Sequence, residues 1–248
     1  MFDVTESAYD RFMGRYSTRL APAFADFAGI DARHRVLDVG AGTGALTSEL
    51  VRREAQVAAV DPSPPFVAAL ERRLPGIEVA HGPAEQLPWD DGCFDAALAQ
   101  LVVAFMSDAP AGVREMRRVV RRGGVVAVCM WDLHGMEMLA AVHRTQRALT
   151  PDAPTAESRT RYRSREELQG LLGADAQVEP LEVEADYSGF DDFWEALLDG
   201  AGPAGTWAKA LDDSRRAAAR DELHRQLGSP EGPFSLPART WAARVTCD

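Results

Sequence analysis

The chain contains 248 residues, of which 46% are hydrophobic and 26% charged, and its formal net charge is -11 at pH 7. This size and composition fit a single globular α/β domain. The acidic excess argues against a large nucleic-acid interface, because a phosphate backbone requires a basic surface. A small nucleoside-containing ligand is still compatible with this charge.

Further properties bear on location and cofactors. No apolar run approaches the roughly 20 residues of a membrane helix, and the acidic, aromatic segment MFDVTESAYDRF is unlike a secretory or transit signal. Cys93, Cys129 and Cys247 lie far apart and match no metal-ligand or disulfide spacing. We therefore expect a cytoplasmic protein with reduced cysteines, no metal site and no membrane partner.

The first half of the chain alternates between predicted helices and strands. Residues 5–29 carry apolar side chains at spacings of three and four, which predicts a helix. Residues 35–39 form a short apolar run before glycines, which favours a buried parallel strand. Further predicted helices are 45–53, 66–74 and 109–121, and further predicted strands are 56–60, 77–81, 94–100 and the run VVAVCMW, which follows a turn at 122–124. This alternation predicts a parallel, doubly wound sheet covered by helices on both faces.

The second half departs from this alternation. Residues 176–187 are predicted as a strand, residues 190–226 as mostly helical and residues 238–246 as a final strand. Residues 150–160 are rich in Pro, Ser and Thr without periodicity, which predicts a mobile loop.

A glycine-rich turn follows the first predicted strand in the segment VLDVGAGTG. Gly40 and Gly42, with Ala45, satisfy the dinucleotide-binding fingerprint, so the glycines alone do not discriminate between ligand classes. Asp38 adds a carboxylate near the carboxyl end of a buried strand, which is costly unless a cation or several donors meet it. We interpret Asp38 as the partner of a ligand ammonium or a water network. The alternatives are a helix cap or an ion pair with Arg35.

A second carboxylate, Asp61, ends the next predicted strand, nineteen positions after Gly42. At a strand tip its two oxygens can accept hydrogen bonds from ribose hydroxyls. Alternatively, Asp61 begins a turn with Pro62. Together, Asp38 and Asp61 describe a ligand with a cationic end and a ribose, which is the shape of S-adenosylmethionine.

Several ordered motifs resemble those of class I S-adenosylmethionine-dependent methyltransferases, and specifically the bacterial small-molecule type. VLDVGAGTG resembles motif I of that family, and VAAVDPS resembles the acidic strand end that follows it. HGPAEQLPWDDGCFD is similar to the adenine-contacting loop, REMRRVVRRGGVVAVCMWD to the fifth helix–strand unit, and YDRFMGRYS to the N-terminal helix. The resemblance covers about residues 8 to 132.

The resemblance implies a seven-stranded, Rossmann-like sheet, mostly parallel with an antiparallel last strand, plus helical lid elements. It also implies S-adenosyl-L-methionine as the cofactor. The implied cofactor-binding residues are Tyr9, Arg15, Asp38, Gly40, Ala41, Gly42, Asp61, Pro62, Ala84, Glu85, Gln100 and Leu101. Tyr9 and Arg15 would close over the cofactor, whereas Ala84 and Glu85 would lie beside the adenine. Pro83 replaces an aspartate that the family often has, so either Glu85 substitutes as acceptor for the adenine amine or the affinity for the cofactor is lower.

The whole chain is expected to form one methyltransferase domain, residues 1–248. The expected parts are an N-terminal helical cap (1–34), a cofactor-binding core (35–132), lid and substrate elements (133–175 and 190–227) and final strands (176–187 and 238–246). Their aromatic and sulfur-containing side chains could line an acceptor pocket or form the core of the lid. These side chains are Phe12, Tyr16, Trp131, Met136, Met138, Tyr162, Phe193, Trp194 and Trp207.

The expected reaction is methyl transfer to a small, apolar or aromatic acceptor. The candidate catalytic residues are His134, in a loop after the fifth strand, and Gln100, at the end of the fourth. The alternatives are a protein of this fold that binds the cofactor without methylating, as a regulator or as a pericyclic or decarboxylating catalyst, and a nicotinamide-dependent oxidoreductase. We expect no nucleic-acid partner, and a monomer or homodimer.

Overall fold

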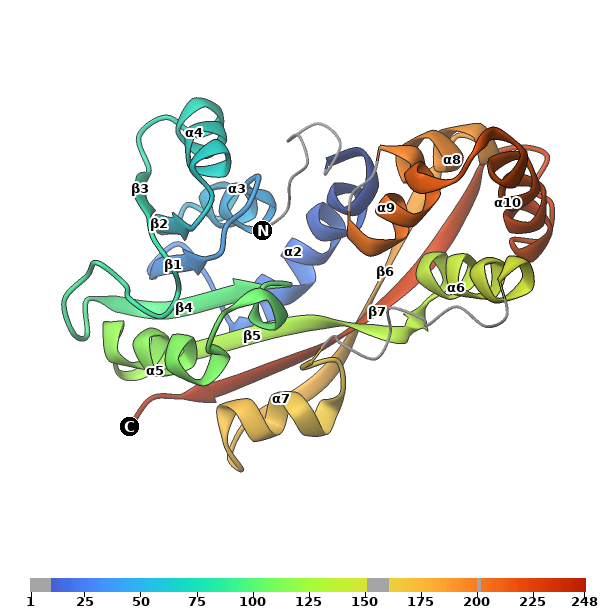
Figure 1. Cartoon of the computed structure of the whole chain (residues 1–248). Coiled ribbons are helices and arrows are strands. Elements are labelled where there is room, and N and C mark those ends of the chain that lie inside the picture. The colour runs from blue at the N-terminus through green and yellow to red at the C-terminus, as the bar shows by residue number, and fades with distance from the viewer. Residues whose placement is uncertain (1–9, 151–160, 200–201) are drawn as a thin grey trace.

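The structure of the chain is a computed structural model, and it describes residues 10–150, 161–199 and 202–248 (Figure 1). Its seven-stranded sheet has the order β3-β2-β1-β4-β5-β7-β6. The strands are β1 (Arg35–Val39), β2 (Gln56–Asp61), β3 (Glu78–His81), β4 (Phe94–Gln100), β5 (Val120–Met136), β6 (Gln177–Tyr187) and β7 (Phe234–Thr246). Strands β1 to β5 pair in parallel, and β7 runs antiparallel to both β5 and β6. The expected seven-stranded, mostly parallel Rossmann-like sheet with an antiparallel last strand is therefore confirmed.

Helices cover both faces of this sheet (Figure 1). The helices are η1 (Asp10–Gly14, a π-helical turn), α2 (Arg15–Ala28), α3 (Ala45–Arg52), α4 (Pro64–Arg73), η2 (Val103–Phe105, 3-10), α5 (Ala109–Val119), α6 (Glu137–Leu149), α7 (Arg165–Leu172), α8 (Phe190–Leu198), α9 (Gly202–Ala210) and α10 (Asp213–Gln226). Helices α2 and α3 pack on one face, and α5 and α7 on the other. Helices α6, α8, α9 and α10 gather around the far ends of β6 and β7 (Figure 1).

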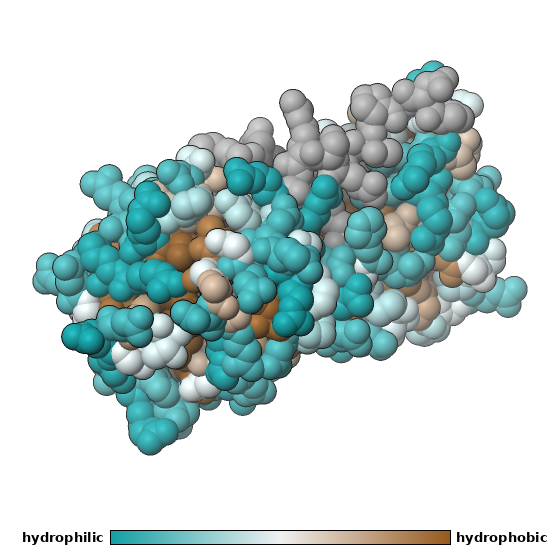
Figure 2. All heavy atoms as spheres, turned by 90° about the horizontal axis from the view of Figure 1, so that it is seen from below, coloured by the Kyte–Doolittle hydropathy of each residue, from teal (hydrophilic) through white to brown (hydrophobic). Residues whose placement is uncertain are grey.

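The central strands are buried on both faces, which explains why their sequences read as continuous apolar runs. In β1, Val36 joins the hydrophobic cluster under α2 and α3, whereas Leu37 joins the cluster under α5 and α7. Outside these clusters the described surface is mainly polar. Figure 2 shows one face covered largely by hydrophilic residues, with small hydrophobic patches between them.

Two local predictions were wrong around β5. Residues 122–124 do not form a separate turn, because α5 ends at Val119 and β5 begins immediately, with an irregular register beside β4. Gly124 permits this continuation: a Cβ there would lie 2.5 Å from the backbone oxygen of Asp95. Strand β5 also continues to Met136, so His134 lies within the strand and not in a loop after it. The loop predicted at 150–160 lies, apart from its first residue, outside the described residues.

Candidate cofactor site

A cavity of about 270 Å³ lies at the carboxyl ends of the parallel strands. In a doubly wound sheet this is the edge where ligands bind. Its walls come from the glycine loop, the ends of β2 and β4, and the segments that follow β3 and β4. The lining residues are Gly40, Gly42, Asp61, Pro62, Ser63, Phe66, Pro83, Ala84, Glu85, Gln100, Leu101, Val102, Phe105, Met106 and Ser107. Eight of the predicted cofactor residues are therefore brought together: Gly40, Gly42, Asp61, Pro62, Ala84, Glu85, Gln100 and Leu101.

The two glycines of the loop have different physical requirements. Both have positive φ, +71° at Gly40 and +57° at Gly42, a region that favours glycine. A Cβ at Gly40 would lie 2.4 Å from Val102 Cγ2, so Gly40 allows close packing within the protein. A Cβ at Gly42 would meet nothing within 4 Å. Gly42 thus leaves open space at the cavity wall, and such space allows the backbone to approach a ligand closely.

Asp61 is held rigidly at the tip of β2. One carboxylate oxygen accepts a hydrogen bond from the Gly42 amide and the other from the Ser63 amide, both at 2.8 Å. The side chain is buried, and desolvation raises the pKa of this carboxyl above its ordinary value. A carboxylate oxygen can accept two hydrogen bonds, so each oxygen of Asp61 keeps one acceptor position. Two acceptor positions, one on each oxygen, fit the two hydroxyls of a ribose diol.

Asp38 has a different environment from the one that its position in the sequence suggested. It is buried, does not line the cavity, and accepts a hydrogen bond at 2.6 Å from the hydroxyl of Thr47, in the first turn of α3. Burial raises its pKa to about 7. An ion pair with Arg35 is excluded, because the Arg35 guanidinium pairs with Glu78. The observed hydrogen bond therefore matches the alternative interpretation, in which Asp38 contacts the start of a neighbouring helix.

The segment after β3 forms another wall of the cavity. Ala84 is buried there, and Pro83 and Glu85 line the cavity beside it. One Glu85 oxygen accepts a hydrogen bond at 2.9 Å from the amide of Asp108, the residue that precedes α5. Glu85 therefore shares its carboxylate between a structural contact and the cavity.

Gln100 and Leu101 close the cavity at the end of β4. The Gln100 side-chain nitrogen donates to the Ser17 carbonyl on α2 at 3.0 Å, and its buried carbonyl oxygen has no hydrogen-bond partner within the described residues. Leu101 has φ +63°, which is uncommon for a residue other than glycine. Strained backbone of this kind occurs often at binding sites. An orphaned acceptor and a strained residue therefore adjoin the same cavity.

Four predicted residues do not line this cavity. Ala41 is in the glycine loop, but its neighbours Gly40 and Gly42 form the wall. The Arg15 guanidinium pairs with both carboxylate oxygens of Asp192 on α8. His134 is exposed, and its amide donates to Asp132 at 3.0 Å. Asp38 is the fourth. Tyr9 lies outside the described residues.

The aromatic side chains proposed for an acceptor pocket are mostly packed into the protein. Phe12, Tyr16, Trp131, Met136, Met138, Tyr162, Phe193 and Trp194 are buried, and Trp207 is partly buried against the same cluster as most of them. None of them lines the cavity. The structure therefore matches the interpretation of these side chains as the core of the lid.

Several wall residues were missed from the sequence. Phe66, Val102, Phe105 and Met106 give the cavity an apolar side, and Phe105 is 56% exposed. For Val102, Phe105 and Met106 the available signal was the apolar run LVVAFM directly after β4, because residues that follow a parallel strand lie at its carboxyl edge. Phe66 lies in α4, outside this run. Within the described part of the chain, no cluster of metal-ligating side chains and no helix long and apolar enough to cross a membrane is found.

The chain has a Rossmann-like sheet with a cavity at the carboxyl edge of its parallel strands, and comparisons with known proteins show which proteins share this fold. A family model described as a methyltransferase domain matches residues 37–128. The chain is 39% identical over 131 residues to an uncharacterised methyltransferase of Mycobacterium tuberculosis, covering 53% of this chain and 51% of that protein. It is 36% identical over 127 residues to a demethylmenaquinone methyltransferase of Beutenbergia cavernae, covering 51% and 52%.

A solved structure agrees over a larger part of the chain. A putative type II methyltransferase from Anaeromyxobacter dehalogenans superposes with a TM-score of 0.66 and 24% identity, covering 93% of this chain and 96% of that one. At this identity the superposition shows the fold. The chain spans about half the length of the curated relatives it matches. Residues 37–128 thus match a methyltransferase domain, and the chain shares the fold of a solved structure described as a putative methyltransferase.

Proposed function

We propose that this protein transfers a methyl group from S-adenosylmethionine to a small-molecule acceptor. The observation that carries the proposal is the position of Asp61, whose oxygens are each fixed by one backbone amide and each keep one acceptor position toward the cavity. Among the residues that the structure describes, Gly42 supports it with the open space beside its Cα, and Gln100 with its buried carbonyl oxygen that has no hydrogen-bond partner. These residues fit a ribose and a polar, amino-acid-like end.

The roles of the chain's own residues follow from this fit. Asp61 would hold the ribose, Gly40 and Gly42 would allow the backbone to approach, and Ala84 and Glu85 would flank the base. Phe66, Phe105 and Met106 would exclude water from one side of the cavity. Asp38 lies outside the lining, so any contribution to an ammonium would pass through Thr47 and the start of α3.

The cofactor supplies an electrophilic methyl group whose transfer removes the sulfonium charge. The protein therefore needs to hold donor and acceptor in line, and this positioning can supply most of the acceleration. A base is required only where the acceptor carries a proton at neutral pH. His134 and Gln100 remain the candidates for a direct role, and Gln100 is the one that adjoins the cavity.

We propose a small, apolar or aromatic acceptor. The apolar wall after β4 supports this class, and so does the name of the demethylmenaquinone methyltransferase relative, which covers half of the chain. The cap elements and the core would act as one domain in this proposal, with the cap setting acceptor selectivity.

The test combines binding and turnover. Calorimetry should detect tight binding of S-adenosylhomocysteine and weak or no binding of NAD, because the Gln100 carbonyl oxygen and the apolar wall after β4 suit an amino-acid-like end better than a second nucleotide. Label from methyl-labelled S-adenosylmethionine should then pass to members of a panel of phenols, quinols and amines. Binding without transfer to any of them would favour a cofactor-binding protein that does not methylate. Preferential binding of NAD would contradict the proposal.

A further inference from the structure

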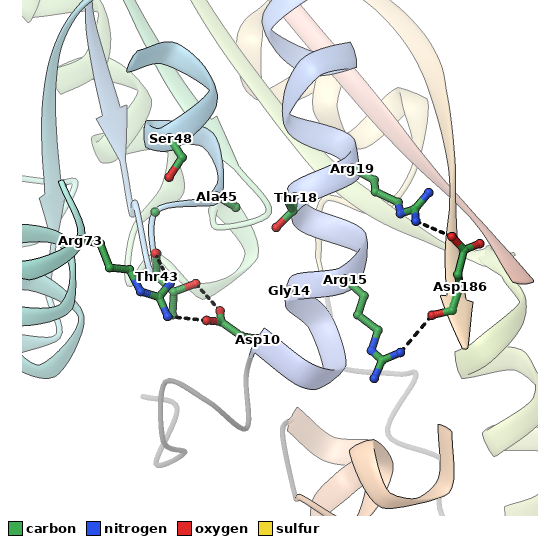
Figure 3. Close-up of a pocket in the computed structure, with 11 residues that line it drawn as sticks. Asp10, Gly14, Arg15, Thr18, Arg19, Thr43, Ala45, Ser48, Arg73 and Asp186 are labelled. Carbon is green, nitrogen blue, oxygen red and sulfur yellow. Dashed lines mark hydrogen bonds and ion pairs between the residues drawn. The ribbon is translucent and has the colours of Figure 1, made fainter. Parts of the chain in front are cut away.

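Three side chains from separate parts of the chain meet beside the glycine loop (Figure 3). Asp10, in η1, accepts a hydrogen bond from the Thr43 hydroxyl at 2.7 Å and pairs with the Arg73 guanidinium at 2.5 Å. Arg73, at the end of α4, also donates to the Thr43 carbonyl at 2.9 Å. Each of the three residues thus contacts the other two. We name Asp10, Thr43 and Arg73 the clasp.

The clasp acts on the part of the glycine loop that faces the cofactor cavity. Thr43 is buried between Gly42 and Gly44, whose positive φ values make this turn possible. Gly42 is held on one side by the hydrogen bond that its amide donates to the Asp61 carboxylate. On the other side the clasp fixes Thr43, which is the next residue. The position of Gly42 in the cavity wall therefore depends both on its hydrogen bond to Asp61 and on the clasp at Thr43.

The turn η1 and the start of α2 also contact the region of α8. Arg11 pairs with Asp199 at 2.8 Å, and Arg15 pairs with Asp192 on α8. The turn itself is π-helical, a rare conformation that occurs frequently at functional sites. Element η1 and the first residue of α2 thus connect the glycine loop, through Asp10, with α8 and the residue that follows it, through Arg11 and Arg15.

We propose that Asp10 is a positioning residue of the cofactor site, which acts through Thr43 and Arg73 to hold the glycine loop in its binding geometry. This inference rests on the proposed function. Asp10 does not line the cavity that contains Gly42 and Asp61. It lines a second cavity of about 490 Å³, together with Thr43 and Arg73, whose lining shares no residue with the first cavity. Its effect on the cofactor is therefore indirect.

A merely structural ion pair would behave differently. The side chains of Asp10 and Arg73 are 34% and 39% exposed, and pairs of this exposure contribute little to global stability. If the clasp only stabilised the fold, its removal would change neither cofactor affinity nor the local mobility of the loop. If the clasp positions the loop, its removal lowers the cofactor affinity and the protection of the loop amides from hydrogen exchange, while the melting temperature changes little.

The test uses the full chain and S-adenosylhomocysteine as the probe. Asp10→Asn keeps an oxygen for the Thr43 hydroxyl but removes the charge that faces Arg73, and Arg73→Gln removes the opposite charge. We expect each variant to raise the calorimetric Kd about three- to tenfold, and the double variant to be no weaker than the worse single one, because members of one network are not additive. Amide hydrogen exchange at Thr43 and Gly44 should accelerate in all three variants.

The matched control is Arg19→Gln. It removes an exposed ion pair with Asp186 on the same side of the molecule as the clasp, but touches neither the loop nor η1. It should leave both the Kd and the loop exchange unchanged. If Asp10→Asn fails to fold, Thr43→Val provides the second variant, since it removes the hydroxyl and keeps the side-chain shape.

The outcomes separate the two proposals. Wild-type protein that does not bind S-adenosylhomocysteine would contradict the proposed function. Wild-type binding together with a Kd within about twofold in Asp10→Asn and Arg73→Gln would overturn the role of Asp10 alone, and so would strictly additive effects or an equal effect of Arg19→Gln.

Discussion

The contacts of Asp61 allow the consequence of its removal to be worked out. Asp61→Ala deletes the acceptor of two backbone amides, those of Gly42 and Ser63, each at 2.8 Å. Hydrogen bonds to a charged group contribute roughly 1.5–3 kcal/mol each, and the desolvation of the carboxylate offsets part of this. We expect the free energy of unfolding to fall by about 2–4 kcal/mol.

The same substitution removes the proposed acceptor of the ribose hydroxyls. Losing those bonds should weaken S-adenosylhomocysteine binding by about 1–3 kcal/mol, which is roughly a 5- to 150-fold higher Kd. Urea unfolding first establishes that the variant is folded, and calorimetry then gives the Kd. Asp61→Asn keeps one carbonyl oxygen and should fall between the wild type and Asp61→Ala.

Asp95→Ala is the matched control for this experiment. Asp95, near the start of β4, also accepts a backbone hydrogen bond, from Arg35 at 2.6 Å, but it does not line the cavity. It should lose stability without losing affinity. A folded Asp61→Ala protein whose Kd stays within about twofold of the wild type would refute the reasoning.

Two other perturbations test the site. Gly40→Ala combines φ +71° with a Cβ clash and should cost about 2–4 kcal/mol of stability in urea unfolding; Gly42→Ala should cost about 1 kcal/mol but weaken S-adenosylhomocysteine binding at least about tenfold. The reverse ranking would contradict the assignment. For Asp38, whose pKa is about 7, the folded state binds the proton more tightly than the unfolded state. Its contribution to stability is therefore full below about pH 4 and is lost as the pH rises through about 7. Asp38→Asn should remove this dependence, on the order of 2–4 kcal/mol, in unfolding curves measured across that range; parallel curves for both proteins would be inconsistent with it.

The fold and half of the site were predictable because their signals are local. Apolar runs predicted strands β1 to β4 to within one residue and the middle of the longer β5, and the helices followed from spacings of three and four. The glycine loop and Asp61 came next to strand ends, and in a parallel sheet all such ends meet at one edge. That geometric rule brought Gly40, Gly42 and Asp61 together, and the family resemblance added Ala84 and Gln100 before any contact was known.

Other outcomes depended on partners distant in the sequence. Asp38 was expected to face a ligand, but Thr47 on the helix after the loop takes one of its oxygens. Arg15 was expected to reach the cofactor, but Asp192 on α8, 177 positions later, binds its guanidinium. No periodicity records which of several polar groups a side chain meets, because that choice depends on how the helices pack.

The sequence by itself thus determined the alternation of strands and helices, the glycine turn and the acidic strand tips, since each depends on neighbours along the chain. The tertiary structure alone decided that the cap's aromatic side chains are core, that β5 continues without a turn, and that Asp10 reaches Thr43 and Arg73. These outcomes required surfaces from separate segments to come together. Burial and pairing of side chains are fixed only when those surfaces meet.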